Sequence, residues 1–348
     1  MKFAIATLAL GLAFVSSASA ASPTLANRVR TAAVHAGFSG EVAVARHGRI
    51  VFAHGYGLAD RAHKRRVGLD TAFNLASMGK MFTGVAAAQL VRAHRLRFGD
   101  RIGKYLPRLP ARLRSITVAQ LLDHTSGLGD FFADPGYERL RPTLTSLGAY
   151  LPLVTSERLL FRPGTRWSYS NSGFLLAGLV IQKASGQRYD RYLARHVWKP
   201  AGMRHTGCYR RTRLPSFAAI GYQQGGAPDT ATLAPVGTSA GGCYSSARDL
   251  LAFARALEDG RLVGRALAKV ITTSKVRAPG GGYGFGFGIR NGPGGQPPTI
   301  WHNGGAPGAA GELDIDPKLG VVAVTLGNVS PPHVFPVVEA TLAALGIP

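Results

Sequence analysis

The sequence has few of the residues that build metal sites and disulfide frameworks. Among its 348 residues only 2 are cysteines, and neither a C-x-x-C nor an H-E-x-x-H spacing occurs. Two cysteines are too few for a disulfide-rich scaffold, and structural or catalytic zinc usually needs such ligand spacings. We therefore expect no metal site. Cys208 and Cys243 either form one disulfide or remain two buried thiols.

Acidic residues are also scarce. The chain has 18 Asp+Glu against 41 Lys+Arg, which gives a formal net charge of +23. The basic runs at residues 61–66 and 92–114 carry no interleaved stacking aromatics, and no helix-turn-helix, finger or RNP pattern accompanies them. We therefore expect no nucleic-acid partner, and we interpret the charge as a solvated basic face.

Long apolar runs are absent after the N-terminus. Residues 3–15 are apolar, follow Lys2 and lead into Ala18-Ser19-Ala20. This run is shorter than the ~20 residues that cross a bilayer, and A-x-A before Ala21 is typical of a signal-peptide cleavage site. We expect residues 1–20 to be a signal peptide and residues 21–348 to be periplasmic or extracellular, without a transmembrane anchor. Anionic cell-envelope polymers would then be the natural partners of the basic surface.

What the chain does have is enough apolar surface for a core, since 46% of its residues are hydrophobic. That content excludes a disordered protein. Strand-like patterns lie near both ends of the chain, at residues 40–46, 50–55, 283–290, 299–302, 313–316 and 321–326. Helical patterns lie at residues 25–36, 78–91, 117–123, 174–184, 189–197, 247–257 and 334–345.

This arrangement predicts an α/β fold of the α+β type. An antiparallel sheet would be formed from both chain ends and flanked by helices, with a mostly α-helical subdomain inserted between them. We place the sheet subdomain at about residues 21–76 and 275–348, and the helical subdomain at about residues 77–274.

Ser77-Met78-Gly79-Lys80 begins the apolar helical pattern and places a serine and a lysine one turn apart. A serine hydroxyl becomes a nucleophile when a base takes its proton, and a lysine can be that base if burial lowers its pKa. The S-x-x-K spacing is short, so a lysine that merely extends out of a core helix is the competing interpretation.

Two further clusters carry polar groups suited to acyl transfer. Tyr169-Ser170-Asn171 precedes a helix, where a tyrosine could relay a proton and an asparagine could orient a lysine or simply cap the helix. His302-Asn303-Gly304-Gly305 follows a short strand, where bare glycine backbone would let a substrate approach and an N–H could stabilise an oxyanion.

Serine-lysine, then Tyr-x-Asn, then a basic residue-x-Gly, in this order, resemble the motifs of the penicillin-recognising serine hydrolases. That superfamily contains D-alanyl-D-alanine carboxypeptidases, class C β-lactamases, D-aminopeptidases and esterases. Further matching segments cover nearly the whole chain after the signal peptide: His124-Thr125-Ser126-Gly127-Leu128, Pro200-Ala201-Gly202-Met203, Gly241-Gly242-Cys243-Tyr244-Ser245-Ser246 and Tyr283-Gly284-Phe285-Gly286-Phe287-Gly288.

The resemblance implies a role for each matched residue. Ser77 would be the acylated nucleophile, Lys80 its proton acceptor and Tyr169 a proton carrier, although Tyr169 could also be the principal base. Asn171 would hold Lys80 and a substrate amide, and His302 would take an electrostatic position. The backbone N–H groups of Ser77 and Gly305 would form an oxyanion hole. No cofactor would be needed, and the substrate would be a small-molecule or peptide amide or ester.

Departures from the family pattern bear on the substrate. Histidine at position 302 stands where β-lactamases carry lysine, which favours a carboxypeptidase, a D-amino-acid peptidase or an esterase. Asn303 and Gly305 replace the hydroxyl side chains that carboxypeptidases use for the substrate carboxylate. We expect Asn303 and Gly304 to contact the substrate and Arg290 to supply a bidentate carboxylate contact.

Two rival interpretations compete with this one. Gly237-Thr238-Ser239-Ala240-Gly241 matches the G-x-S-x-G nucleophile elbow, but Pro235 and the following glycines argue against the strand and helix that an elbow needs. A catalytically silent basic envelope-binding protein is the other rival. A buried lysine is costly to keep without a role, which favours an enzyme.

Overall fold

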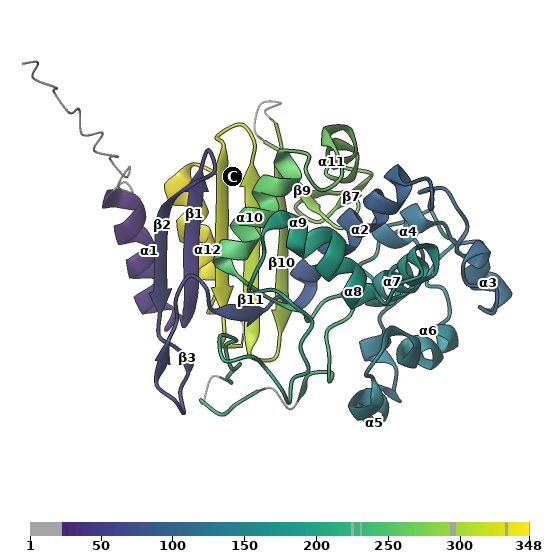
Figure 1. The fold of residues 1–348 in the computed structure, drawn as a ribbon, viewed down its shortest axis with the longest axis horizontal. Coiled ribbons are helices and arrows are strands. Elements are labelled where there is room, and N and C mark those ends of the chain that lie inside the picture. Colours follow the sequence, from purple (N-terminus) through teal and green to yellow (C-terminus); the bar gives the residue numbers. More distant parts are fainter. Residues whose placement is uncertain (1–22, 224–225, 230–231, 293–296, 331–332, 348) are drawn as a thin grey trace, which may run out of the picture.

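The fold is built around one antiparallel sheet, as the computed structural model shows for residues 23–223, 226–229, 232–292, 297–330 and 333–347 (Figure 1). Its eight strands lie in the order β2-β1-β12-β11-β10-β9-β8-β7. The strands are β1 (Gly40–Arg46), β2 (Arg49–Tyr56), β7 (Val276–Ala278), β8 (Gly281–Tyr283), β9 (Gly288–Arg290), β10 (Thr299–Ala306), β11 (Ala309–Asp316) and β12 (Val321–Gly327).

The pairing of β1 with β12 joins the two ends of the chain within this sheet. The predicted fold class is therefore confirmed: an antiparallel sheet from both chain ends is flanked by helices. Two short ribbons, β3 (Leu58–Asp60) with β4 (Arg65–Arg66) and β5 (Ala72–Asn74) with β6 (Tyr244–Ser246), lie outside it. The subdomain boundaries at residues 76 and 275 stay predictions.

Side-chain alternation along β1 gives the sheet two different faces. Val42 and Val44 pack with α1 (Pro23–His35) and α12 (Phe335–Leu345), whereas Ala43 and Ala45 join the main core. Figure 1 shows α1 and α12 side by side on one side of the strands, with α10 on the other. The sheet therefore lies between two helical layers.

The helices between β5 and β9 form the larger part of the main core. They are α2 (Lys80–Arg92), α3 (Ala111–Arg114), α4 (Val118–Leu122), α5 (Tyr137–Leu140), α6 (Leu151–Ser156), α7 (Asn171–Ser185), α8 (Tyr189–Leu193), α9 (Lys199–Ala201), α10 (Ala247–Glu258) and α11 (Arg265–Ile271). The central pair is α2 and α7, which are apolar almost all round and nearly fully buried.

Three strand predictions were wrong in detail. The strand predicted at residues 313–316 already begins at Ala309. Residues 283–290 form two strands rather than one, because residues 284–287 turn between β8 and β9, with Gly286 in the left-handed region at φ 86°. The strand predicted to end at residue 302 continues to Ala306, pairing with β11 throughout. The segment His302 to Gly305 therefore lies within a strand and not in a loop.

The predicted signal peptide, residues 1–20, lies outside the described residues. Among the helices in the described part of the chain, none combines the length and apolar character required to span a membrane. Cys208 and Cys243 form a disulfide, which resolves the open alternative between a bond and two thiols.

Candidate active site

Ser77 lies in a short 3-10 helix, η1 (Ala76–Gly79), that leads directly into α2. Ala76 just before it has φ 43°, a left-handed conformation that is unusual for a residue with a Cβ. Two contacts hold this turn: Asn74 Oδ1 accepts from the Ala76 N–H at 2.8 Å, and the Gly242 N–H donates to the Ala76 carbonyl at 3.1 Å. The strained turn presents Ser77 to a cavity.

Lys80, at the start of α2, is completely buried directly beneath Ser77. Its Nζ lies 3.1 Å from Ser77 Oγ, 2.7 Å from Asn171 Oδ1 and 2.6 Å from the Ala240 carbonyl oxygen. Burial lowers the pKa of Lys80 to about 7, and the nearby negative charge of Asp130 opposes that shift only in part.

The partners of Lys80 determine what its neutral form can do. The oxygens of Asn171 and Ala240 can only accept, so they take the two N–H groups of a neutral amine. The remaining lone pair then faces the Ser77 hydroxyl. This geometry suits proton transfer from serine to lysine.

Tyr169 contacts both the serine and the lysine. Its hydroxyl is hydrogen-bonded to the Ser77 side chain, and its ring centroid lies 4.7 Å from Lys80 Nζ. Burial is the main cause that raises the pKa of Tyr169 well above its ordinary value, so the phenol stays protonated at neutral pH. His124, which is fully buried, packs its ring 4.4 Å from that of Tyr169.

Asn171 is the first residue of α7, and it does not cap that helix. The cap is Ser170, whose Oγ accepts from the Gly173 N–H at 2.8 Å. Asn171 is thereby free to accept from Lys80 while its Nδ2 donates to Asp130 Oδ2 at 2.7 Å. Asp130 went unnoticed in the sequence, although its position two residues after the segment His124 to Leu128 could have drawn attention to it.

His302 lies near the site but does not provide a positive charge. It is buried on β10, where burial first and the charge of Lys80 second lower its pKa to about 3. Its Nδ1 donates to the Asn303 carbonyl at 2.6 Å, so its Nε2 accepts from the Tyr283 hydroxyl at 2.9 Å. The expected electrostatic position is therefore occupied by a neutral, fully bonded imidazole.

Of the two glycines beside His302, Gly305 lies at the cavity, whereas Gly304, expected to contact the substrate, does not. Gly305 lines the cavity together with Ser77. Gly304 contacts η1, since a Cβ added to it would lie 2.3 Å from the Leu75 carbonyl oxygen and 3.0 Å from the Ser77 nitrogen. Gly304 therefore allows the strand to pack against the nucleophile turn rather than touching the cavity itself.

The expectation that Asn303 and Arg290 contact substrate has to be corrected. Asn303 pairs with Glu312 across the sheet, and alternation turns its side chain away from the face that carries His302. Arg290 binds Asp314 at 2.8 Å and Glu312 at 3.0 Å, and it stacks on the Trp301 ring. Neither side chain lines the cavity, and the arginine is already neutralised by two carboxylates.

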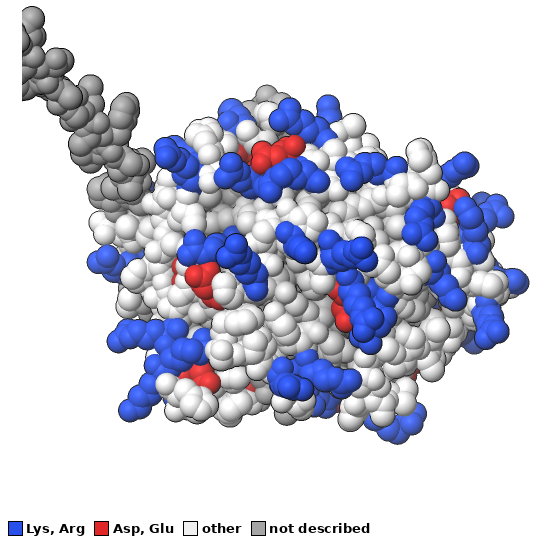
Figure 2. All heavy atoms as spheres, viewed as in Figure 1, with Lys and Arg blue, Asp and Glu red and all other residues white. Residues whose placement is uncertain are grey.

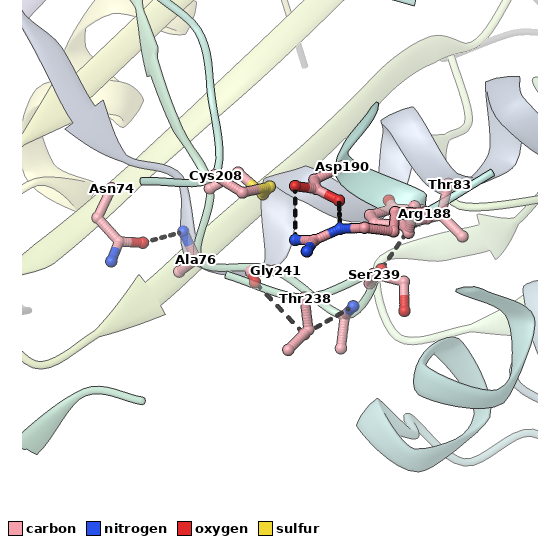
Figure 3. Close-up of a disulfide and its surroundings, with 12 residues drawn as sticks. Asn74, Ala76, Thr83, Arg188, Asp190, Cys208, Thr238, Ser239 and Gly241 are labelled. Carbon is pink, nitrogen blue, oxygen red and sulfur yellow. Dashed lines mark hydrogen bonds and ion pairs between the residues drawn. A yellow bond between two sulfur atoms is a disulfide. The ribbon is translucent and has the colours of Figure 1, made fainter. Parts of the chain in front are cut away.

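The loop from Gly237 to Gly242 forms another wall of the cavity, yet Ser239 turns away from it. The side chain of Ser239 is buried, and a Cβ added to Gly178 of α7 would lie only 2.2 Å from its Oγ. Figure 3 shows this loop beside the disulfide, with Thr83 donating to the Ser239 carbonyl at 2.7 Å. A nucleophile-elbow role for Ser239 does not fit this geometry.

These groups surround a cavity of about 540 Å³. Its floor contains Ser77, Tyr169 and Asn171, and its remaining walls are mainly apolar. The aromatic members are Phe131 and Phe132 of η3 (Phe131–Ala133), Tyr137 of α5 and Tyr150 of η5 (Leu147–Tyr150). A concave, mostly apolar site with a few convergent polar groups is typical of sites that bind small molecules.

Comparison with known proteins agrees with this geometry. The sequence profile of the Beta-lactamase family matches residues 25–346. Two Bacillus subtilis (strain 168) proteins that bear the name penicillin-binding protein are 32% and 30% identical over 265 and 295 residues, which cover 74% and 78% of this chain. The matched regions make up 63% and 64% of those relatives, so each relative is substantially longer than the shared part.

Solved structures show the same arrangement. A penicillin-binding protein from Bacillus halodurans superposes with a TM-score of 0.84 at 29% identity, over 90% of this chain and 98% of that one. A D-stereospecific amidohydrolase from Streptomyces sp. superposes with a TM-score of 0.75 at 28% identity, over 92% and 98%. The fold and the helical insertion are thus shared over nearly the full described length.

Proposed function

The chain belongs to the Beta-lactamase family of serine hydrolases, and from this premise we propose that it cleaves an amide or ester through an acyl-enzyme on Ser77. The observation that carries the proposal is the position of Lys80 Nζ, which lies 3.1 Å from Ser77 Oγ with two other acceptors fixing its direction. A buried amine with its pKa lowered to about 7 is suited to accept the serine proton.

In the first step, neutral Lys80 takes the proton of Ser77 as Oγ attacks the substrate carbonyl. The carbonyl oxygen becomes an oxyanion, and the N–H groups of Ser77 and Gly305 would stabilise it, because both residues line the cavity. Tyr169 is hydrogen-bonded to Ser77 and would pass a proton to the leaving group while regaining one from Lys80.

In the second step, water attacks the acyl-enzyme, gives its proton to the same base and releases the acid, so that Ser77 recovers its proton. The raised pKa of Tyr169 makes a resident tyrosinate unfavourable, and for this reason we assign the role of principal base to Lys80. His302 is neutral and accepts a hydrogen bond from the Tyr283 hydroxyl. Its role would be to hold Tyr283 in place near the catalytic groups.

For the finer activity, we propose a D-amino-acid amidase or peptidase, or an esterase. The similarity to a D-stereospecific amidohydrolase supports this branch, as does histidine in place of the lysine that β-lactamases carry at position 302. D-alanyl-D-alanine carboxypeptidase and β-lactamase activities are the alternatives that the experiment has to separate.

The test is a panel of acyl donors offered to the purified protein: a fluorescent penicillin, an acyl-D-alanyl-D-alanine, a D-amino-acid p-nitroanilide and p-nitrophenyl esters. Turnover of the anilide or the esters is expected. Stable labelling by the penicillin, together with release of D-alanine from the acyl-D-alanyl-D-alanine, would favour the carboxypeptidase. Rapid turnover of the penicillin would favour the β-lactamase. If no donor reacts, the hydrolase proposal fails and the envelope-binding protein takes its place.

A further inference from the structure

The walls of the cavity differ sharply in charge from the rest of the molecule. The chain carries a net charge of +23, and Figure 2 shows Lys and Arg side chains spread over the visible face. Yet among the described residues that line the cavity there is no lysine, arginine or histidine. The single acidic lining residue, Glu138, is paired with Arg141 at 2.9 Å.

Three basic side chains near the catalytic serine are not available to a substrate carboxylate. Lys80 is held by three oxygens, and one of them belongs to the nucleophile itself. His302 is neutral, since its pKa is lowered to about 3. Arg290 is paired with Glu312 and Asp314 on the opposite face of the sheet. A carboxylate entering the cavity would therefore lose water without gaining an ionic partner among the described residues that line it, which is costly.

The aromatic wall offers a different kind of contact. Ring centroids lie 4.4 Å apart for Phe131 and Phe132, 4.9 Å for Phe131 and Tyr150, and 4.9 Å for Phe132 and Tyr137. Asp130 immediately precedes these rings and binds Asn171, so the wall is anchored to the catalytic groups. Phe132 is 54% exposed, which is unusual for a phenylalanine and leaves an uncovered ring at the cavity.

We propose that this site selects uncharged substrates: esters or amides that carry an aromatic or bulky apolar group for the aromatic wall and no free carboxylate beside the scissile bond. The inference rests on the proposed acyl-enzyme function and narrows its substrate class. It disfavours peptides with a C-terminal carboxylate as well as carboxylate-bearing β-lactams.

The charge preference is tested with one ester in two forms. Phenylacetyl-glycyl-D-lactate is offered as the free acid and as its methyl ester, and release of phenylacetyl-glycine is measured, so that cleavage of the same internal ester bond is compared. We expect kcat/KM for the methyl ester to exceed that for the acid by at least about tenfold, the size of one lost polar contact. Equal values, or a preference for the acid, would overturn the proposal.

A gain of function provides a test that misfolding cannot imitate. Ala306 lines the cavity at the end of β10 and is only partly buried. Ala306→Lys should raise kcat/KM for the free acid relative to the methyl ester, whereas the matched uncharged variant Ala306→Gln should not. If both variants leave the ratio unchanged, the absence of a cation is not what decides the preference.

The aromatic preference is tested at Phe132. In Phe132→Ala the ratio of kcat/KM for p-nitrophenyl phenylacetate to that for p-nitrophenyl acetate should fall about tenfold, since one aromatic contact is lost. Leu160→Ala is the control, because Leu160 is similarly exposed at 59% but does not line the cavity. An unchanged ratio in Phe132→Ala would contradict the proposed wall.

Failure of the proposed function can be distinguished from failure of this inference. If wild-type protein hydrolyses none of these substrates, the acyl-enzyme proposal fails. The preference of the cavity can then still be measured as the affinity of Ser77→Ala protein for uncharged and charged ligands. The amide of phenylacetyl-glycine should bind to it more tightly than the free acid. The reverse order would overturn the inference whatever the outcome for catalysis.

Discussion

Lys80 Nζ and Ser77 Oγ lie 3.1 Å apart, at the junction of a strained turn and the buried helix α2. The distance matters because the other two neighbours of Nζ, Asn171 Oδ1 and the Ala240 carbonyl, can only accept hydrogen bonds. Deprotonation of Lys80 therefore leaves its lone pair directed at the serine. The whole account of catalysis depends on this direction.

The rate of acylation should depend on pH through Lys80. Its pKa is lowered to about 7 by burial, and the protonated amine cannot accept the Ser77 proton. We expect the second-order rate of Ser77 acylation to rise with pH and to reach half of its plateau near pH 7. Stopped-flow measurement with an activated ester between pH 5 and 9 checks this.

His302→Gln is the control for that pH profile, because a histidine is the other group that could titrate there. The pKa of His302 is lowered to about 3, so in this variant the acylation rate should still rise with pH near pH 7. If this rise disappears in the variant, the titrating group is His302 and not Lys80.

Asp130→Asn should slow acylation and also shift its pH profile. Asp130 accepts from Asn171, and its negative charge raises the pKa of Lys80. Loss of the charge should therefore move the rising limb to lower pH, while the plateau should fall about tenfold as Asn171 loses its partner. A residue with only a structural role would lower the plateau without moving the limb.

Asp134→Asn is the matched control for that variant. Asp134 lies four residues further along the same segment and bonds to the Gly136 N–H and the Ser156 hydroxyl, not to Asn171. Asp134→Asn should leave the pH at which the acylation rate rises unchanged. An equal shift in both variants would mean that the effect comes from the segment as a whole and not from Asp130.

The disulfide should stabilise the protein and hold the nucleophile turn. Cys208 and Cys243 are 35 residues apart, for which loop closure corresponds to about 3–4 kcal/mol of unfolding free energy. The Cys243 carbonyl accepts from the Leu75 N–H at 2.8 Å, two residues before Ser77. Replacing both cysteines by serine should therefore lower both stability and acylation rate. Urea unfolding with an unchanged midpoint would contradict this.

The basic surface should bind anionic polymers through charge. A net charge of +23 attracts polyanions over distances set by salt, and the screening length shortens from about 10 Å at 0.1 M to about 3 Å at 1 M. We expect the protein to sediment with anionic lipid vesicles at low salt and to lose most of this binding by 0.5 M NaCl. It should not sediment with zwitterionic vesicles. Binding that does not depend on the salt concentration would rule out a charge-driven contact.

The resemblance of the short motifs to those of one family predicted that Ser77, Lys80, Tyr169 and Asn171 would share a site; each motif alone left a structural alternative open. Strand patterns at both chain ends likewise predicted the mixed origin of the sheet. These patterns are local in the sequence, so they can be recognised without knowledge of tertiary packing.

The errors and omissions arise where tertiary geometry decides. Asn303 and Arg290 were expected at the substrate because they are near His302 in sequence. Strand alternation turns Asn303 on β10 to the other face, and Arg290 at the end of β9 pairs with Glu312 and Asp314 instead. The aromatic wall was missed because residues 129–156 form short helices without a sustained apolar period.

The central claim is that Ser77 is the residue that becomes acylated, and intact-protein mass spectrometry tests it most directly. Wild-type protein and Ser239→Ala should each gain the mass of one acyl group from an activated ester or a fluorophosphonate, with the adduct on the peptide that contains Ser77, and Ser77→Ala should gain none. An adduct that persists in Ser77→Ala, or that disappears in folded Ser239→Ala, would contradict the account.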